Sequence, residues 1–450
     1  METQDSGRDS LMDQVEESVE SSNLGWETFW EAGSRAFQLG RYADAEKLFQ
    51  KSLADVKSPD AVDSRRSPAE EDTLSNATTA ERVVAQAKIL SSLGELYLVQ
   101  GWHVEAEKAY KKAMSLKEKI SGPDSLSVAE ILNKLGVIYR AQGKFQEVEP
   151  VLRRALTLYE KDASANKLDL ATALETLADF YRAHGKYDMA EPLFQKGLAM
   201  RESVLGADHQ SIGPALQNLA LLNHASGKYD LAMPLYERAL KISEATWGAE
   251  HPSCATILNQ QGELYRMKGD FPSAEKTFWR ALRIRQTALG VEHPSTAQTL
   301  ASLALLFHLQ CKYDQAEPLY KTLVDLRTKD WGPKHPHVAE MLNSLAEVYQ
   351  DQGKYSEAEP LYWRALSITQ EAQGPEHPSV AKALRNLAEL YEEQENYDEA
   401  DRLFRWGLGV GEKALGSEHP EVTELMARYA SLQKRMSEND EDMPSTNWQD

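Results

Sequence analysis

Apolar residues along most of this chain return with the spacing of amphipathic helices, in pairs separated by a short polar turn. Leu132, Leu135 and Tyr139 follow the three-to-four-residue spacing of one buried helix face. Gly143 stands where a residue in the left-handed conformation closes a helix. A second apolar stripe then begins and includes Leu152. The pattern predicts a unit of two helices joined by a tight turn.

This unit recurs at a fixed interval of 42 residues. The turn position is occupied in successive copies by Gly101, Gly143, Gly185, Gly227, Gly269, Cys311, Gly353 and Glu395. An earlier copy has Gly40 at this position, and the 19 surplus residues before Gly101 fall in a Ser/Pro/Asp-rich stretch. A fixed period of this size is typical of a stacked array, in which each helix pair buries its apolar face against its neighbours.

Two further features of the period bear on its geometry. A small residue recurs on the first helix, at Gly94, Gly136, Ala178, Ala220, Gly262, Ala304, Ala346 and Ala388. We expect the two helices of a pair to approach each other closely there. Because side chains with a Cβ atom disfavour the left-handed region, we expect strained or reshaped turns at Cys311 and Glu395.

The repeated pattern L-(G/A)-x-x-Y, followed by A-x-x-x-(F/Y) and a further A, resembles the tetratricopeptide repeat (TPR). The 42-residue length and the phrases "GKYxEAEPLYxRAL" and "G-x-x-HP" look most like the repeats of kinesin light chains. The resemblance implies an all-α fold, a right-handed α-solenoid of stacked antiparallel helix pairs known as the TPR superhelix.

Composition and period together predict the organisation of the chain. We expect a disordered acidic N-terminal tail over 1–24, a first TPR-like helix pair over 25–54, a disordered acidic insert over 55–80, an array of eight 42-residue repeats over 81–420, a capping helix over 421–436 and a disordered acidic tail over 437–450. Residues 1–24, 55–81 and 436–450 carry 15 of the 20 net negative charges. The array is therefore nearly neutral, which argues against a nucleic-acid partner.

Several classes of protein are disfavoured by the sequence. No apolar run approaches the roughly 18 residues that would span a bilayer, and the acidic start lacks the blocks of a signal peptide. Cys254 and Cys311 have no CxxC spacing and cannot form a disulfide framework. We therefore predict a cytoplasmic protein with reduced thiols and no membrane partner.

Six histidines share one phase of the repeat, and all but the first precede a proline: His209, His251, His293, His335, His377 and His419. A zinc site would require ring nitrogens within a few ångströms of each other. Side chains in successive helix pairs lie roughly 8–10 Å apart or more. We therefore predict that these histidines cap helices before a proline at the first helical position, and we expect no metal or cofactor.

No sequence motif for catalysis is present. The chain has no GxxxxGK[ST] phosphate loop, no HExxH, no GxSxG and no GxGxxG after a strand. Catalytic groups converge from different elements on one pocket, whereas a solenoid spreads its side chains along a line. We predict a non-enzymatic protein.

The resemblance implies that the first helix of each pair lines a concave groove. The stripe one residue away from the buried one faces this groove, at the phases of Asn133, Val137 and Arg140. The peptide-binding candidates at these phases are Asn133, Arg140, Arg182, Gln217, His224, Asn259, Arg266, His308 and Asn343. Arginine grips carboxylates with two hydrogen bonds, and asparagine bonds an extended peptide backbone.

We therefore predict an adaptor or scaffold that binds an extended acidic or acidic-aromatic peptide in this groove. The resemblance points the same way, since kinesin light chain repeats grip acidic peptides through groove asparagines and arginines. The matching phases here are occupied by Asn133, Asn259, Asn343, Arg140, Arg182 and Arg266.

Two alternatives stay open. Glu175, Asp179 and Glu263 stand among the basic groove residues and could neutralise them within the chain. The protein could instead be a structural assembly subunit that uses its convex face, where the second helices carry Trp279, Trp363 and Trp406. The oligomeric state, the partner and the role of the insert are left open by the sequence.

Overall fold

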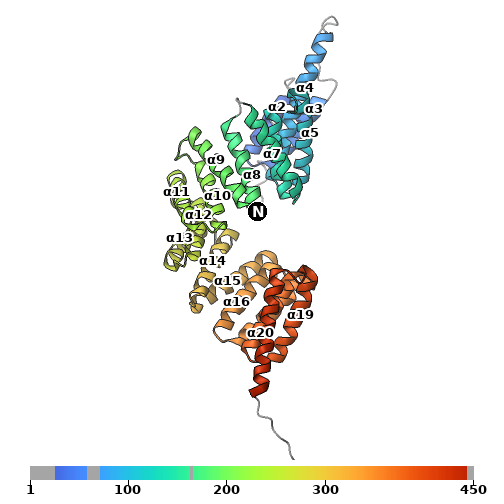
Figure 1. The fold of residues 1–450 in the computed structure, drawn as a ribbon. Coiled ribbons are helices and arrows are strands. Elements are labelled where there is room, and N and C mark those ends of the chain that lie inside the picture. The colour runs from blue at the N-terminus through green and yellow to red at the C-terminus, as the bar shows by residue number, and fades with distance from the viewer. Residues whose placement is uncertain (1–25, 58–70, 163–165, 443–450) are drawn as a thin grey trace, which may run out of the picture. The chain divides into compact units, whose positions relative to one another are not determined.

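The computed structural model describes residues 26–57, 71–162 and 166–442, and every regular element within them is an α-helix (Figure 1). The helices are α2 (Trp26–Gln38), α3 (Tyr42–Lys57), α4 (Glu71–Val99), α5 (His103–Ser121), α6 (Leu126–Ala141), α7 (Phe145–Lys161), α8 (Lys167–Ala183), α9 (Tyr187–Leu205), α10 (Ile212–Ala225), α11 (Tyr229–Trp247), α12 (Pro252–Met267), α13 (Phe271–Leu289), α14 (Pro294–Leu309), α15 (Tyr313–Trp331), α16 (Pro336–Asp351), α17 (Tyr355–Gln373), α18 (Pro378–Glu393), α19 (Tyr397–Leu415) and α20 (Pro420–Asp442). The predicted all-α fold is confirmed.

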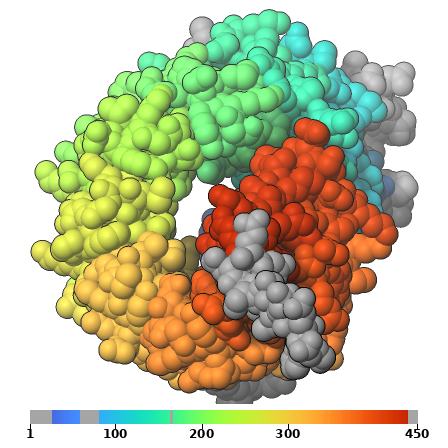
Figure 2. All heavy atoms as spheres, turned by 60° about the horizontal axis from the view of Figure 1, so that its bottom comes forward, coloured from blue at the N-terminus to red at the C-terminus, as the bar shows by residue number. Residues whose placement is uncertain are grey.

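The chain forms two compact units, Met1–Ile242 and Ser243–Asp450, with the boundary inside α11. Within each unit, consecutive helices pack as pairs, and the second helix of one pair also packs against the first helix of the next. At some junctions the first helices of neighbouring pairs touch as well, as α6 touches α8 and α12 touches α14. In the space-filling view the atoms of neighbouring pairs adjoin within each unit (Figure 2).

A close approach between the two helices of each pair fixes their packing. The first helix carries a small residue, and the residue 16 positions later on the second helix is a large apolar one. A Cβ atom on Gly136 would lie 2.3 Å from the Leu152 side chain, and one on Gly262 would lie 2.5 Å from the Phe278 ring. The predicted close approach at the small residues is confirmed.

A hydrogen bond links successive pairs at several junctions. The Tyr391 hydroxyl on α18 donates to Glu359 on α17 at 2.6 Å, and the Tyr349 hydroxyl on α16 donates to Glu317 on α15 at 3.0 Å. This explains why a tyrosine in the first helix and a carboxylate early in the second recur together. Two copies lack the tyrosine: one has Phe307, and the other has Asn223, whose buried side-chain oxygen has no partner among the described residues.

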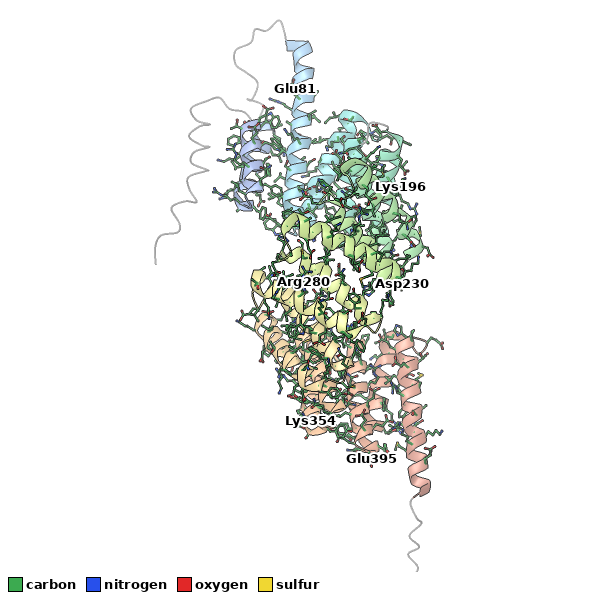
Figure 3. All side chains as sticks on the ribbon, turned by 90° about the vertical axis from the view of Figure 1, so that its left-hand side faces the viewer. Glu81, Lys196, Asp230, Arg280, Lys354 and Glu395 are labelled. Atoms are coloured by element: carbon green, nitrogen blue, oxygen red, sulfur yellow. The ribbon has the colours of Figure 1, made fainter. Side chains whose placement is uncertain are left out.

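The turns within the pairs depend on left-handed backbone. Glycine supplies it in most copies, as at Gly353 with a φ of 71°. Cys311 and Glu395 adopt the same conformation with φ of 56° and 60°, although both carry a side chain. Figure 3 labels Glu395 at the turn between α18 and α19. The expectation of strained turns at these two positions is therefore confirmed.

Five histidines of the shared phase cap helices, as predicted, whereas His209 lies before Ser211, which is the N-cap of α10. In each of the six, ring nitrogen Nδ1 accepts a hydrogen bond from the backbone amide two residues later, at 3.1–3.3 Å. After each of the last five, the following proline is the first residue of the helix, as in α12 after His251. Among the described residues, no group of three or more His, Cys, Asp or Glu side chains is arranged to hold a metal ion.

Two element boundaries differ from those expected. Helix α4 begins at Glu71, inside the insert predicted as disordered over 55–80, and α3 continues to Lys57. No proline or glycine follows Pro68 before Gly94, so nothing in the sequence stops the helix from extending towards its N-terminus. At the other end, α20 covers the predicted cap of 421–436 and continues to Asp442. The rest of the three predicted acidic segments lies outside the described residues.

Among the helices described, none is both long enough and apolar enough to cross a membrane.

The strained turns yield a stability prediction. We expect Cys311→Gly and Glu395→Gly each to raise the free energy of unfolding by about 1 kcal/mol, because glycine removes the clash of Cβ in the left-handed region. The reciprocal variant Gly353→Ala, at the same phase, should lower it by a similar amount. Urea-unfolding midpoints would measure these changes, and a decrease for both glycine variants would contradict the assignment of strain.

Candidate peptide-binding groove

The predicted groove residues lie beside the buried stripe of the first helices. On α6, Leu132 and Leu135 are buried, whereas Asn133, Val137 and Arg140 are half-buried. The equivalent candidates Arg182, Gln217, His224, Arg266, His308 and Asn343 are half-buried too. Asn259 differs, since only 6% of its surface is exposed. The first helices touch between α6 and α8, α8 and α10, and α12 and α14, so the candidates on these neighbouring helices lie on a shared surface.

In the first unit, two arginines share one carboxylate. Arg140 on α6 bonds Oδ2 of Asp179 on α8. Arg182, three residues after Asp179, donates to Oδ1 from Nε at 3.1 Å and from Nη2 at 2.6 Å. One negative charge therefore faces two guanidinium groups, which leaves an excess of positive charge at this point of the groove.

Glu175, the other acid that the sequence places near these arginines, is paired with an arginine on the next helix. Glu175 on α8 accepts hydrogen bonds from Nε and Nη2 of Arg201 on α9, at 2.7 and 2.9 Å. Both side chains are largely buried, with 14% and 16% of their surfaces exposed. Glu175 is thus occupied within its own helix pair, and its charge does not offset the pair of arginines on Asp179.

The groove asparagines have unused hydrogen-bonding capacity. The side-chain oxygens of Asn133, Asn259 and Asn343 are buried, and none accepts a hydrogen bond from a described residue. A buried oxygen without a partner costs free energy, so an incoming N–H group would be stabilised there. Gln217 is different, because its amide makes a long contact of 3.5 Å to the carbonyl oxygen of Gly213.

In the second unit, the predicted basic residues are paired one to one. Arg266 donates to Glu263 on the same helix at 2.9 Å. His308 on α14 lies 2.7 Å from Asp351 on α16. The open question of neutralisation is thus answered differently in the two units, since Glu263 matches Arg266 whereas Asp179 is shared. His224, in the first unit, packs edge-on against Tyr229 with ring centroids 5.7 Å apart.

The sequence did not reveal a cavity of about 520 Å³ in the second unit. Helices α14, α16, α17 and α18 contribute to its walls, and Arg428 and Arg435 reach it from α20. Burial raises the pKa of both Glu347 and Glu389 in its lining. The two arginines belong to the capping helix, outside the eight copies on which the groove positions were aligned, so the phase of the repeat gave no signal for them.

The tryptophans of the second helices are partly exposed. Trp279 and Trp406 each expose 45% of their surface, and Trp363 exposes 38%. The Trp363 indole donates to the Tyr391 hydroxyl at 3.4 Å. An assembly role through these side chains stays a prediction.

Comparison with known proteins decides the family. A family model described as tetratricopeptide repeat matches residues 85–161, 169–245, 248–329 and 337–413. The chain belongs to the tetratricopeptide-repeat family. Its members use the extended concave surfaces of their stacked repeats as scaffolds for protein–protein interaction.

No curated protein matches the chain in sequence. Among solved structures, a signal-transduction ATPase with numerous domains and a tetratricopeptide-repeat sensor, from Pyrococcus horikoshii, is 13% identical, with a TM-score of 0.56 over 86% of this chain and 54% of that one. Aspartyl phosphate phosphatase F from Bacillus subtilis is 16% identical, with a TM-score of 0.51 over 83% of this chain and 97% of that one. Nearly identical TPR-like repeats of a putative kinesin light chain from Podosopora anserina are 25% identical, with a TM-score of 0.41 over 45% of this chain and 95% of that one.

The raised pKa of Glu347 predicts a pH-dependent effect on stability. Between the unfolded and folded pKa values the folded state binds more protons, so stability falls as pH rises through this window. We expect Glu347→Gln to be more stable than the unaltered protein at pH 7, because it removes a charge that burial disfavours. The difference should shrink as the pH falls towards the ordinary pKa of a glutamate side chain.

Thermal unfolding midpoints across this pH range would measure the effect. Glu340→Gln on the same helix is the matched control, since the Glu340 side chain is 63% exposed. An equal response of the two variants would contradict a cost of burial at Glu347.

Proposed function

We propose that this protein is an adaptor whose groove in the first unit holds an extended peptide, with acidic side chains of the peptide bound by Arg140 and Arg182. One observation carries the proposal: two guanidinium groups share the single carboxylate of Asp179. Arginine binds a carboxylate through two parallel hydrogen bonds, and each of these arginines has donors that one shared carboxylate does not satisfy.

The pair is accessible to a ligand. The side chains of Arg140, Arg182 and Asp179 expose 37%, 30% and 25% of their surfaces. A peptide carboxylate approaching from the groove would take one guanidinium and leave the other on Asp179. The result is one acid for each arginine, as in the second unit, where Arg266 already has Glu263. Binding is therefore an exchange within a charged network and needs no rearrangement of the helices.

The asparagines supply contacts that do not depend on the peptide's side chains. Asn133 lies two turns before Arg140 on the same helix, and its buried oxygen has no partner, so it would accept a backbone N–H of the peptide once the side chain turns towards the groove. Asn259 and Asn343 offer the same acceptor in the second unit. We infer that sequence preference comes from the arginines and that the asparagines hold the extended backbone. A cytoplasmic location stays a prediction.

Charge reversal in the groove tests the proposal. The combined variant Arg140→Glu and Arg182→Glu should lose binding to Asp- and Glu-rich peptides, because three carboxylates would then face each other around Asp179. The measurement is binding of the labelled full-length protein to an array of random-sequence peptides. We expect acidic peptides to be enriched among those bound by the unaltered protein and absent among those bound by the variant.

The matched control is the combined variant Arg283→Glu and Arg402→Glu. It makes the same change in net charge at arginines that also pair with a carboxylate but are 65% and 75% exposed. This control should retain acidic-peptide binding, and binding should weaken as salt rises. Equal losses in both variants, or no enrichment of acidic peptides at all, would overturn the assignment.

A further inference from the structure

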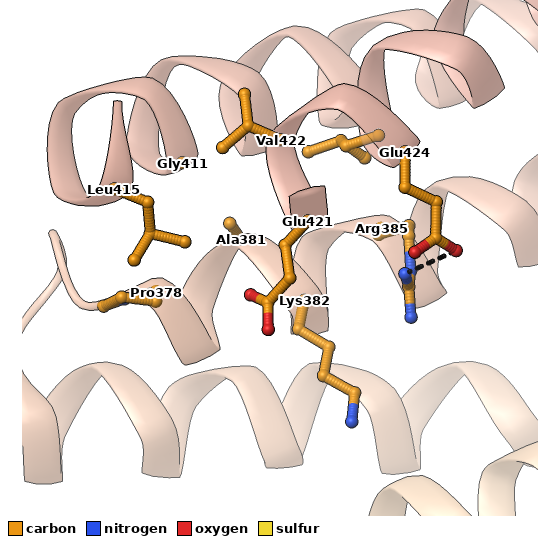
Figure 4. A pocket seen from close by; sticks show the side chains of 10 residues that line it. Pro378, Ala381, Lys382, Arg385, Gly411, Leu415, Glu421, Val422 and Glu424 are labelled. Atoms are coloured by element: carbon orange, nitrogen blue, oxygen red, sulfur yellow. Dashed lines mark hydrogen bonds and ion pairs between the residues drawn. The ribbon is translucent and has the colours of Figure 1, made fainter. Parts of the chain in front are cut away.

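A second cavity, of about 190 Å³, lies at the last junction of the second unit (Figure 4). It is enclosed by the start of α18, the end of α19 and the start of α20. Leu415, Val422 and Leu425 form an apolar wall, and Glu421 and Glu424 provide carboxylates. Gly411 lies in the lining, and a Cβ atom on it would point towards Val422 at 3.3 Å. The cavity is thus the space that a side chain at position 411 would enter.

The repeat shows what fills this space at other junctions. In the earlier copies the position of Gly411 is occupied by Lys117, Tyr159, Arg201, Ser243, Arg285, Arg327 and Thr369. Only the last copy has glycine there. The cavity therefore arises from the loss of a side chain at one phase of an otherwise regular packing arrangement.

Two of the cations at this phase, Lys117 and Arg285, contact the helix that follows them. Lys117 reaches the carbonyl oxygen of Ser127 at 3.4 Å and the Glu130 carboxylate at 3.5 Å. Arg285 donates from Nη1 to the carbonyl oxygen of Ser295 at 2.7 Å and to the Thr299 hydroxyl at 2.6 Å. Only 4% of the Arg285 surface is exposed, so this space accepts a whole arginine side chain.

The last junction lacks the cation but keeps two of the three kinds of acceptor, since only the Thr299 hydroxyl is lost, to Leu425. Glu421 stands at the phase of Ser127 and Ser295, and Glu424 stands at the phase of Glu130. In the part of the chain that the structure describes, no ion pair reaches the Glu421 carboxylate. Glu424 has one contact, at 3.4 Å, with Arg385. The cavity is therefore better provided with carboxylates than the space that buries Arg285.

The basic neighbours do not fill the space. Arg385 divides its guanidinium between Glu424 and Glu389, the latter 4.0 Å away. Lys382 also lines the cavity, but its side chain runs away from the Glu421 carboxylate in Figure 4. Among the described residues, no carboxylate lies within ion-pair distance of the Lys382 ammonium group.

We propose that this cavity is a socket for an arginine side chain of a partner protein. The guanidinium would bond the Glu424 carboxylate and the backbone carbonyl of Glu421, and the methylene groups would pack on Leu415, Val422 and Leu425. This is an interaction site of opposite charge preference to the groove of the first unit, and it does not rest on the function proposed for that groove. It implies that a partner docks beside the last helix pair with a basic residue inserted.

Methyl NMR of the full-length protein, with labelled Leu and Val methyl groups, tests the socket. The probe is N-acetyl-arginine amide, and the neutral isostere N-acetyl-citrulline amide is its control. We expect the arginine probe to shift the methyl signals of Leu415, Val422 and Leu425, with citrulline causing no saturable shift. Equal shifts with both probes, or none with arginine, would overturn the proposal.

Gly411→Arg should abolish the response, because the protein's own guanidinium would occupy the socket. Gly409→Arg is the matched control, since it adds the same residue to the same helix at an exposed position with no heavy atom within 4 Å of its Cβ. It should bind the probe as the unaltered protein does. Persistence of the response in a folded Gly411→Arg variant would contradict the socket.

Glu424→Gln gives an independent reading should Gly411→Arg fail to fold. It keeps the size of the side chain and removes one charge, so we expect the apparent Kd for the arginine probe to rise about threefold. An unchanged Kd would show that the carboxylate does not receive the guanidinium, and the proposal would then be wrong.

Discussion

The whole architecture depends on the close approach of two helices at one small residue in each repeat. Where Gly262 faces Phe278, a single Cβ atom would already lie 2.5 Å from the ring. Close packing at this point fixes the rotation of each first helix against its partner, because interiors of proteins tolerate little change in volume. Since the same contact recurs every 42 residues, the neighbouring stripe of each first helix faces the same way throughout a unit. The line of candidate groove residues is a consequence of that contact.

The groove positions are equivalent in packing from one repeat to the next, but they differ in their ion pairs. Asp179 serves two arginines in the first unit, whereas Arg266 and His308 each have a carboxylate in the second. Partly exposed ion pairs contribute little to stability, so exchanging one of these carboxylates for that of a peptide, as we propose, would cost the fold little. Gly411 is a similar case. The helices pack there as at the other junctions, but the side chain that stands at this phase in the earlier copies, a cation in several of them, is missing. At Asp179 and at Gly411, comparison with the equivalent positions of the other repeats shows what has changed.

The sequence predicted the period, the close approach, the histidine caps and the strained turns, because each depends on residues near one another in the chain. It also named Asp179 as a possible partner of the groove arginines. It could not show that Arg140, 39 positions earlier, competes with Arg182 for that carboxylate, since this depends on how far α6 and α8 are staggered. The sequence did not predict the socket. A glycine at this phase indicates a cavity only when the structure shows where the side chains at the equivalent positions lie. The sequence analysis did not predict that α4 begins at Glu71. The polar composition of residues 55–80 favoured disorder, although no proline or glycine follows Pro68 before Gly94.

The most direct test of the account is the affinity of Asp179→Asn for a labelled acidic peptide selected on the unaltered protein, measured by fluorescence anisotropy. This substitution removes the internal competitor while keeping the shape of the side chain. If Arg140 and Arg182 receive the peptide's carboxylates, the variant should bind about threefold or more tightly, because both guanidinium groups become available. Unchanged or weaker binding would contradict the central claim, since Asp179 would then be part of the recognition surface or irrelevant to it.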